Sequence, residues 1–306
     1  MKEENFINME NISMLNEVLN QEKPKHPLIS IIDFDKVDFL NQPDIVDKKI
    51  TTTFYCILLK KMNSGSVRYG RNYYDFQEGS LFFVAPNQVS ILENPVLAEC
   101  EDDWGLFFHP DLIRGTSLSK KIKEYSFFNY HTNEALHLSD EEKQMISNMA
   151  RSIDIELSRP IDKHSKTVIV SSIELLLNHC MRYYDRQFIT RTETNKDVIS
   201  IIDDYLMTYF KSDKPQELGL PTVQQCASEV NLSANYLADL LKAETGKSTQ
   251  DHIHYYVFES AKNRLLNSND SVSEIAYSLG YEYPQYFSKI FKKKVGMTPV
   301  AYRNLN

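Results

Sequence analysis

The chain repeats itself near its C-terminus, where residues 222–249 read TVQQCASEVNLSANYLADLLKAETGKST and residues 271–299 read SVSEIAYSLGYEYPQYFSKIFKKKVGMTP. Ala227 matches Ala276, 49 positions further on, and a one-residue insertion in the second copy then makes the spacing 50. A short internal repeat of this kind indicates one supersecondary unit used twice.

Each copy opens with a helix-start signal. Thr222 and Gln225 in the first copy, and Ser271 and Glu274 in the second, have the spacing of a capping box. In a capping box the first side chain accepts from the third backbone N–H of the helix, and the third side chain accepts from the backbone N–H of the cap. Both copies are therefore predicted to start a helix at the same place.

Each copy also carries a turn signal and a stop signal. Asn231 and Gly280 fall at the expected turn, and these two residue types tolerate a left-handed backbone best. Pro284 suits the first turn of the second helix of its copy. Gly246 and Gly296 are placed as C-terminal caps. The pattern is typical of two helix-turn-helix units.

The apolar spacing alone would also fit a plain helical bundle with duplicated packing. In both copies the capping box, the turn residue and the C-terminal glycine agree, and a small residue, Ala227 or Ala276, stands where two helices cross closely. This agreement favours the helix-turn-helix interpretation. Residues 250–266 read as one helix between the copies. Such a helix would hold two recognition helices about one DNA turn (~34 Å) apart, so that both enter the major groove on one face.

The stretch SVSEIAYSLGYEYPQYFSKIFKKKVGMTPVAYRN at residues 271–304 resembles the C-terminal signature of the AraC/XylS family of bacterial transcription regulators. The resemblance covers about residues 197–304. It implies a DNA-binding domain at 197–306, with helix-turn-helix units at 222–244 and 271–294 and double-stranded DNA as the partner.

The resemblance also implies which side chains face the DNA. The expected base-reading residues are Asn235, Asp239, Gln285, Ser288 and Lys289. Glutamine suits adenine and lysine suits guanine, so Gln285 and Lys289 have side chains suited to base edges.

Four further residues are expected to contact phosphates, which fix the register of the protein without reading sequence. They are Lys242, Lys292, Lys293 and Arg303. For each lysine a solvated surface charge is the alternative.

Two positions depart from the family. Asp239 stands where relatives often have a basic residue, and Val257 replaces an arginine that is common in the connecting helix. Asp239 either accepts from a cytosine amine or weakens the first helix-turn-helix unit. Both departures put the contribution of that unit to DNA binding in question.

The front of the chain is rich in short β-type runs. From Leu28 to His109, runs of β-branched and aromatic residues alternate with turn signals such as Asn63-Ser64-Gly65. Many short strands without helices between them favour a sandwich or small barrel. With the family resemblance, the expected fold is α+β with two domains: a cupin-like β-barrel with flanking helices at 1–188, a polar linker at 189–196, and an all-α domain.

Two helices are expected to flank the barrel. The first starts at the capping box of Ser139 and Glu142, and the second starts near Asp162. The second helix is apolar over a wide arc, which suits contact with a second subunit in a homodimer or burial within one subunit.

Net charge does not exclude a nucleic-acid partner. The chain carries −8 overall, but residues 195–306 hold 12 basic and 13 acidic side chains, or −1. No acidic residue follows Glu282, whereas five basic residues do. A local basic face can supply phosphate contacts on an acidic protein.

Catalysis is not expected. The strand at 68–80 lacks the histidine pair with which cupin enzymes bind a metal, and the nucleotide-binding and nucleophile motifs are absent. We therefore expect no catalytic residue, metal or cofactor. A ligand pocket is expected from aromatic residues of the barrel: Tyr69, Tyr73, Phe82 and Trp104. Aromatic residues at strand spacing would also suit a plain core.

The chain is expected to be cytoplasmic. Its four cysteines form no CxxC pair, its first residues lack a secretory signal, and no apolar run is long enough to span a membrane.

The leading hypothesis is a homodimeric transcription regulator that responds to a small-molecule effector and works with RNA polymerase. One alternative is a regulator without an effector, either constitutive or controlled by a protein partner. Another is a cupin-type binding protein or enzyme with a helical tail.

Overall fold

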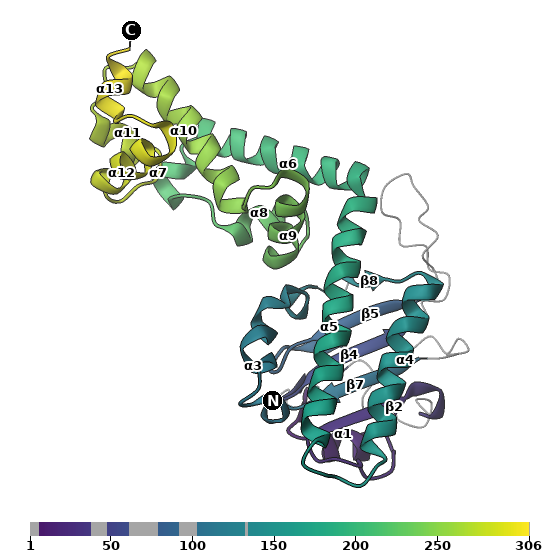
Figure 1. Cartoon of the computed structure of the whole chain (residues 1–306). Coiled ribbons are helices and arrows are strands. Elements are labelled where there is room, and N and C mark those ends of the chain that lie inside the picture. The colour runs from purple at the N-terminus through teal and green to yellow at the C-terminus, as the bar shows by residue number, and fades with distance from the viewer. Residues whose placement is uncertain (1–5, 38–47, 61–78, 92–102, 132–133, 306) are drawn as a thin grey trace. The chain divides into compact units, whose positions relative to one another are not determined.

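A computed structural model of the chain describes residues 6–37, 48–60, 79–91, 103–131 and 134–305 (Figure 1). The chain divides into two compact units, Met1–Gln187 and Phe188–Asn306. The first unit is mixed α+β and the second is helical, so the predicted α+β class with a helical C-terminal part is confirmed.

The first unit contains two sheets. One has the strand order β1-β3-β6 and the other has the order β2-β7-β4-β5-β8. Within the described residues neither sheet closes on itself, so the predicted cupin-like barrel is not confirmed. The strands are β1 (Phe6–Met9), β2 (Ile29–Asp33), β3 (Lys49–Thr52), β4 (Tyr55–Lys60), β5 (Ser80–Val84), β6 (Ser90–Ile91), β7 (Trp104–Phe108) and β8 (Leu136–His137).

The two faces of the five-stranded sheet bury different partners. Side chains alternate between the faces of a strand. One face contributes Cys56, Val84 and Phe107 to a buried cluster that also includes residues of helix α1 (Ile12–Val18). On the other face Phe83 packs against Tyr184 of helix α5 (Ser165–Thr190).

Helix α4 (Asp140–Leu157) lies beside α5 over the same face of the sheet (Figure 1). The capping box of Ser139 and Glu142 begins α4 as predicted. Glu142 also accepts from Arg186 of α5 at 2.6 Å, so the start of one helix is tied to the other. Two short helices, α2 (Pro110–Ile113) and α3 (Leu118–Lys121), follow β7.

The second unit is a set of helices joined by short turns. They are α6 (Thr192–Lys211), α7 (Lys214–Leu218), α8 (Val223–Glu229), α9 (Ala234–Thr245), α10 (Thr249–Asn267), α11 (Val272–Ser278), α12 (Pro284–Val295) and α13 (Pro299–Arg303). The segment 189–196, expected to be a linker, contains the end of α5 and the start of α6, with only Arg191 between the two helices. Among the described residues, no helix combines the length and the apolar character that crossing a membrane requires.

One turn of this unit is held by close backbone packing. Gly280 has φ 88°, and a Cβ at this position would lie 2.7 Å from the carbonyl carbon of Gly219 and 2.8 Å from the carbonyl oxygen of Pro215. Gly296 has φ 87°, but a Cβ there would meet nothing within 4 Å. The two glycines share a backbone conformation and differ in their surroundings.

We expect Gly280→Ala to destabilise the protein much more than Gly296→Ala. Both substitutions place a Cβ in a left-handed residue, which costs about 1–2 kcal/mol. Only Gly280→Ala also forces the Gly219 backbone away. Urea unfolding of both variants measures the difference, and equal losses of unfolding free energy would contradict the close approach at Gly280.

Candidate nucleic-acid interface

The first helix of each repeat starts at its predicted capping box. Thr222 accepts from the backbone N–H of Gln225 at 3.1 Å, and Ser271 accepts from that of Glu274 at 3.2 Å. The Gln225 and Glu274 side chains accept from the backbone N–H of their caps in return. Helices α8 and α11 therefore begin at equivalent places in the repeat.

The turn after each first helix is also the same in both copies. Asn231 has φ 55° and Gly280 has φ 88°, so both occupy the predicted left-handed conformation. The next backbone N–H returns to the first helix: Leu232 donates to the carbonyl of Ala227, and Tyr281 donates to that of Ala276, each at 3.0 Å. These bonds bring the second helix of each copy close to the small alanine on the first.

Helices α9 and α12 are the second helices of the two units. Each ends at the predicted left-handed glycine, Gly246 or Gly296. Each helix buries one face, which leaves the opposite face for a partner. The fully buried side chains of these faces are Leu237, Leu240, Leu241, Phe287 and Phe291.

The predicted base-reading residues lie on the outer part of these helices. Asn235, Gln285 and Lys289 are exposed, whereas Asp239 and Ser288 are half-buried. All five belong to α9 or α12, and none of them contributes to the buried face. Their roles in reading bases stay predictions.

The predicted phosphate contacts fall into two kinds. Lys242, Lys292 and Lys293 are exposed near the C-terminal ends of α9 and α12. Arg303 is instead half-buried, and its guanidinium donates to the backbone carbonyls of Leu265 and Asp270. Arg303 therefore holds the end of α10 in place, a structural role that the sequence did not reveal.

An ion pair that the sequence did not reveal joins helices α10 and α12. Lys294 of α12 lies 2.6 Å from Asp251, which belongs to the capping box of Ser248 at the start of α10. The Lys294 ammonium and the Ser248 hydroxyl hold the pKa of the Asp251 carboxyl well below its usual range. The pair ties the end of one recognition helix to the start of the connecting helix.

Helix α10 connects the two helix-turn-helix units as predicted. Ile253, Ala261 and Leu265 are buried along one side. Val257, which departs from the arginine common in the family, is fully buried among them. A charged side chain at this place would need a buried partner, so valine suits the apolar packing of this chain.

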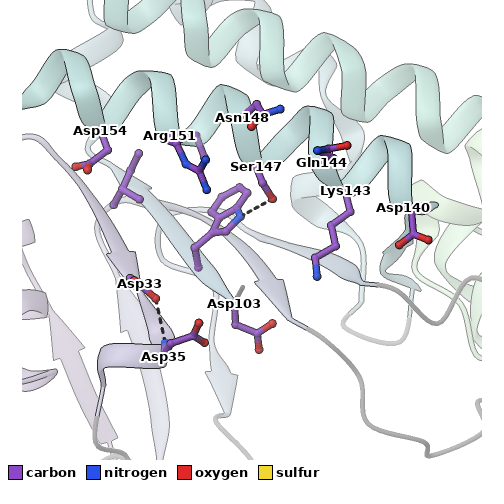
Figure 2. A pocket seen from close by; sticks show the side chains of 13 residues that line it. Asp33, Asp35, Asp103, Asp140, Lys143, Gln144, Ser147, Asn148, Arg151 and Asp154 are labelled. Atoms are coloured by element: carbon purple, nitrogen blue, oxygen red, sulfur yellow. Dashed lines mark hydrogen bonds between the residues drawn. The ribbon is translucent and has the colours of Figure 1, made fainter. Parts of the chain in front are cut away.

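A second candidate site lies in the N-terminal part of the chain, Met1–Gln187, in a groove of about 520 Å³ between α4 and the sheet. Figure 2 shows Asp33, Asp35 and Asp103 on the strand side of the groove, across from polar residues of α4. The α4 wall includes Lys143, Gln144, Asn148 and Arg151. The groove is thus lined by charged and amide groups. Within the described residues, no cluster of His, Cys, Asp and Glu could hold a metal ion.

The predicted aromatic pocket is not assembled as expected. Trp104 lines the groove, and its indole N–H donates to the Ser147 hydroxyl of α4 at 3.1 Å. The strand register places Trp104 opposite Leu59 and Phe82 opposite Leu58. Adjacent residues of a strand face opposite ways, so Phe82 and Trp104 lie on opposite faces of the sheet and cannot line one pocket.

The other two residues predicted for that pocket, Tyr69 and Tyr73, lie outside the described residues.

Comparison with known proteins supports the C-terminal site. Residues 226–305 match a family model described as a helix-turn-helix domain. The raffinose operon transcriptional regulatory protein of Pediococcus pentosaceus is 39% identical over 27% of this chain and 30% of its own length. The xylose operon regulatory protein of Escherichia coli is 34% identical over 28% of this chain and 21% of its own length.

A longer match is to a Bacillus subtilis protein described as an uncharacterized HTH-type transcriptional regulator. It is 24% identical over 83% of this chain and 81% of its own length. A solved response-regulator domain from Geobacillus stearothermophilus is 28% identical over 36% of this chain and 85% of that chain, with a TM-score of 0.32.

The chain spans less than a third of the length of the first two relatives. Residues 226–305 of this chain are similar to a helix-turn-helix domain, and two of the relatives are described as operon regulatory proteins.

We expect Lys294→Met to weaken the domain at neutral pH and to reduce its sensitivity to acid. A carboxyl whose pKa is lowered by folding contributes stability above its unfolded pKa of about 3.9, and this stability is lost as pH falls below that value. Urea unfolding of wild type and variant at pH 7 and pH 3 measures the effect. Because the pair is partly exposed, the difference at pH 7 should stay below about 1 kcal/mol.

A variant that loses as much stability between pH 7 and pH 3 as the wild type would show that Lys294 does not set the pKa of Asp251. Asp251→Asn is the matched control, since it removes the titrating group itself.

Proposed function

We propose that the protein is a sequence-specific DNA-binding transcription regulator. The observation that carries the proposal is the pair of helix-turn-helix units, whose first helices start at equivalent capping boxes and whose turns have a left-handed residue at the same place. A helix-turn-helix protein inserts its second helix into the major groove and contacts base edges with the N-terminal residues of that helix. In this chain those helices are α9 and α12.

The second unit supplies the stronger DNA contact in this proposal. Gln285 and Lys289 are exposed on α12 and carry side chains suited to adenine and guanine. Lys292 and Lys293 follow on the same helix and supply phosphate contacts. On α9, Asn235 is exposed, and Asp239 is an acid that would be repelled by phosphates. The first helix-turn-helix unit therefore contributes less to the affinity for DNA than the second.

We expect Lys289→Ala and Lys292→Ala to weaken DNA binding in different ways. Loss of a base contact should cost about 1–3 kcal/mol and relax the preference at one operator position. Loss of a phosphate contact should weaken binding to all sequences alike and reduce the salt dependence by about one ion. Genome-wide mapping of binding sites, followed by titrations at several salt concentrations, separates the two effects.

If the Lys289→Ala protein binds the same sites with undiminished discrimination at fixed salt, the base-reading assignment is wrong. If the wild-type protein prefers no sequence at all, the proposed function is wrong.

The rest of the chain completes the proposal. Residues 1–188 form a cupin-like sensor and dimerisation domain, 189–196 connect the domains, and 197–306 bind DNA. Exposed apolar residues on α5, Val168 and Leu175, support a homodimer. RNA polymerase is the further partner of such a regulator, and the cytoplasm, where bacterial DNA lies, is its place of action.

We also propose that the N-terminal part of the chain, Met1–Gln187, binds a small-molecule effector in the groove between α4 and the sheet. Its volume of about 520 Å³ lies in the range of small-molecule sites. The groove has carboxylates on its strand wall, and Arg151 and amide groups on its α4 wall. This lining suits a polar ligand that both donates and accepts hydrogen bonds, rather than the apolar ligand that an aromatic pocket would take.

We expect a polar metabolite to raise the melting temperature of the protein in a screen that includes amines, sugars and carboxylates. A ligand at a hundred times its Kd stabilises the folded state by about 2.7 kcal/mol. Arg151→Ala should reduce this shift, because Arg151 lines the groove. Phe82→Leu, on the other face of the sheet, is the control and should keep it.

A ligand whose shift is unchanged by Arg151→Ala binds elsewhere. A screen without any stabilising ligand would favour a regulator that works without an effector.

A further inference from the structure

Tyr283 is an exposed aromatic residue at the start of the second recognition helix. Its side chain is 66% exposed and directly precedes Pro284, the first residue of α12. Within the part of the chain that the structure describes, the Tyr283 ring and hydroxyl make no hydrogen bond or ring contact. Its backbone carbonyl accepts from Tyr286, so the structural role of this residue belongs to its backbone alone.

A tyrosine is a poor choice for this position on grounds of stability. The residue before a helix is best filled by Ser, Thr, Asp or Asn, whose side chain satisfies an unpaired backbone N–H. In the first copy the matching residue is Ser233, whose hydroxyl accepts from the N–H of Tyr236 at 3.1 Å. Tyr283 forms no such side-chain cap. Positions where a sequence departs from a local rule are often functional sites.

A second tyrosine distinguishes the two copies. Tyr236 of the first copy is 5% exposed and packs against Phe188, with 5.1 Å between the ring centroids. The matching Tyr286 of the second copy is 58% exposed. The second copy therefore presents tyrosines on both sides of Gln285, whereas the first copy presents none at the matching positions.

The charge of helix α12, which follows Tyr283, favours DNA as the partner of this surface, although the exposed Glu282 directly precedes Tyr283. Lys289, Lys292 and Lys293 are exposed on the same helix. No acidic residue occurs between Tyr283 and the end of the sequence. An exposed aromatic ring thus lies at the N-terminal start of a helix that carries basic side chains. In a helix-turn-helix protein this helix enters the groove, so such a surface is suited to a nucleic acid.

We propose that Tyr283 is a specificity-determining residue of the second helix-turn-helix unit, which reads a thymine through contact of its ring with the 5-methyl group. This inference rests on the proposed function. The N-terminal end of a recognition helix lies closest to the base edges. Apolar contact with the thymine methyl is one of the direct readouts available in the major groove, and an aromatic ring supplies it.

The test uses the full-length protein and an operator found by binding-site mapping. Tyr283→Ser restores the cap that the first copy has, so the melting temperature should rise by about 2–4 °C. Affinity for the operator should nevertheless fall, by about tenfold, which is within the cost of one wrong base pair. Opposite signs for stability and binding would exclude a merely structural role for Tyr283.

Two further measurements identify the contact. Tyr283→Phe keeps the ring and should bind the operator like the wild type. Replacing one operator thymine at a time by deoxyuridine removes only the methyl group. At one position this should weaken binding of the wild type several-fold and leave the Tyr283→Ser protein unaffected.

Tyr277→Ser is the matched control. Tyr277 is 52% exposed on α11, outside the recognition helix, and the first copy has Ser228 at the matching position. Its loss should leave operator affinity unchanged.

Unchanged affinity in Tyr283→Ser, while Lys289→Ala still loses discrimination, would overturn this inference and leave the proposed function intact. Equal losses in Tyr283→Phe and Tyr283→Ser would also overturn it, since the hydroxyl rather than the ring would then make the contact. A wild-type protein without any preferred sequence would remove the basis of both proposals.

Discussion

The second helix-turn-helix unit depends on one close backbone approach, that of Gly280 to Gly219. The turn residue needs a left-handed conformation, and its neighbour leaves no room for a Cβ. Gly219 is itself held by the Tyr209 hydroxyl of α6, which donates to its carbonyl oxygen at 2.9 Å. The turn before α12 is therefore coupled to α6 through a backbone contact, between Gly280 and Gly219, and a side-chain hydrogen bond from Tyr209.

The two units use the same local design in different surroundings. In the first unit Asn195 donates to the carbonyl of Phe188 and to the carboxylate of Glu244, each at 2.7 Å. These bonds hold the start of α6 against α9, and the Phe188 ring covers that of Tyr236. The second unit has no matching cover at Tyr286 among the described residues. One recognition helix is thus supported on its flank, and the other presents that flank to solvent.

The sequence was sufficient where structure is determined locally. Capping boxes, left-handed turns and C-terminal glycines follow from the chemistry of one to four neighbouring residues, and both copies carry a capping box on the first helix, a left-handed turn residue and a C-terminal glycine. It was insufficient where structure depends on distant segments. Tyr236 and Tyr286 align within the repeat, yet their exposures are opposite because only one of them meets Phe188.

The same limit applies to the N-terminal part of the chain and to the predicted site residues. Trp104 and Phe82 both looked suited to a pocket, but strand register decides the face of each side chain, and register is set by pairing rather than by residue type. Arg303 looked like a phosphate ligand because it is basic and close to the C-terminus. Only the fold shows that it donates to the carbonyl of Leu265, in the last turn of α10, and to that of Asp270, just after the helix.

The distribution of charge explains how an acidic chain can present a surface for DNA. Three lysines end α12, where the helix dipole favours positive charge. Lys294 is neutralised by Asp251, which stabilises the domain. The ammonium groups of Lys292 and Lys293 form no ion pair among the described residues and remain exposed, so their field extends into solvent. Because salt screens charges beyond about 10 Å, a phosphate group near this surface would experience these lysines far more strongly than any acidic residue that lies further away than that.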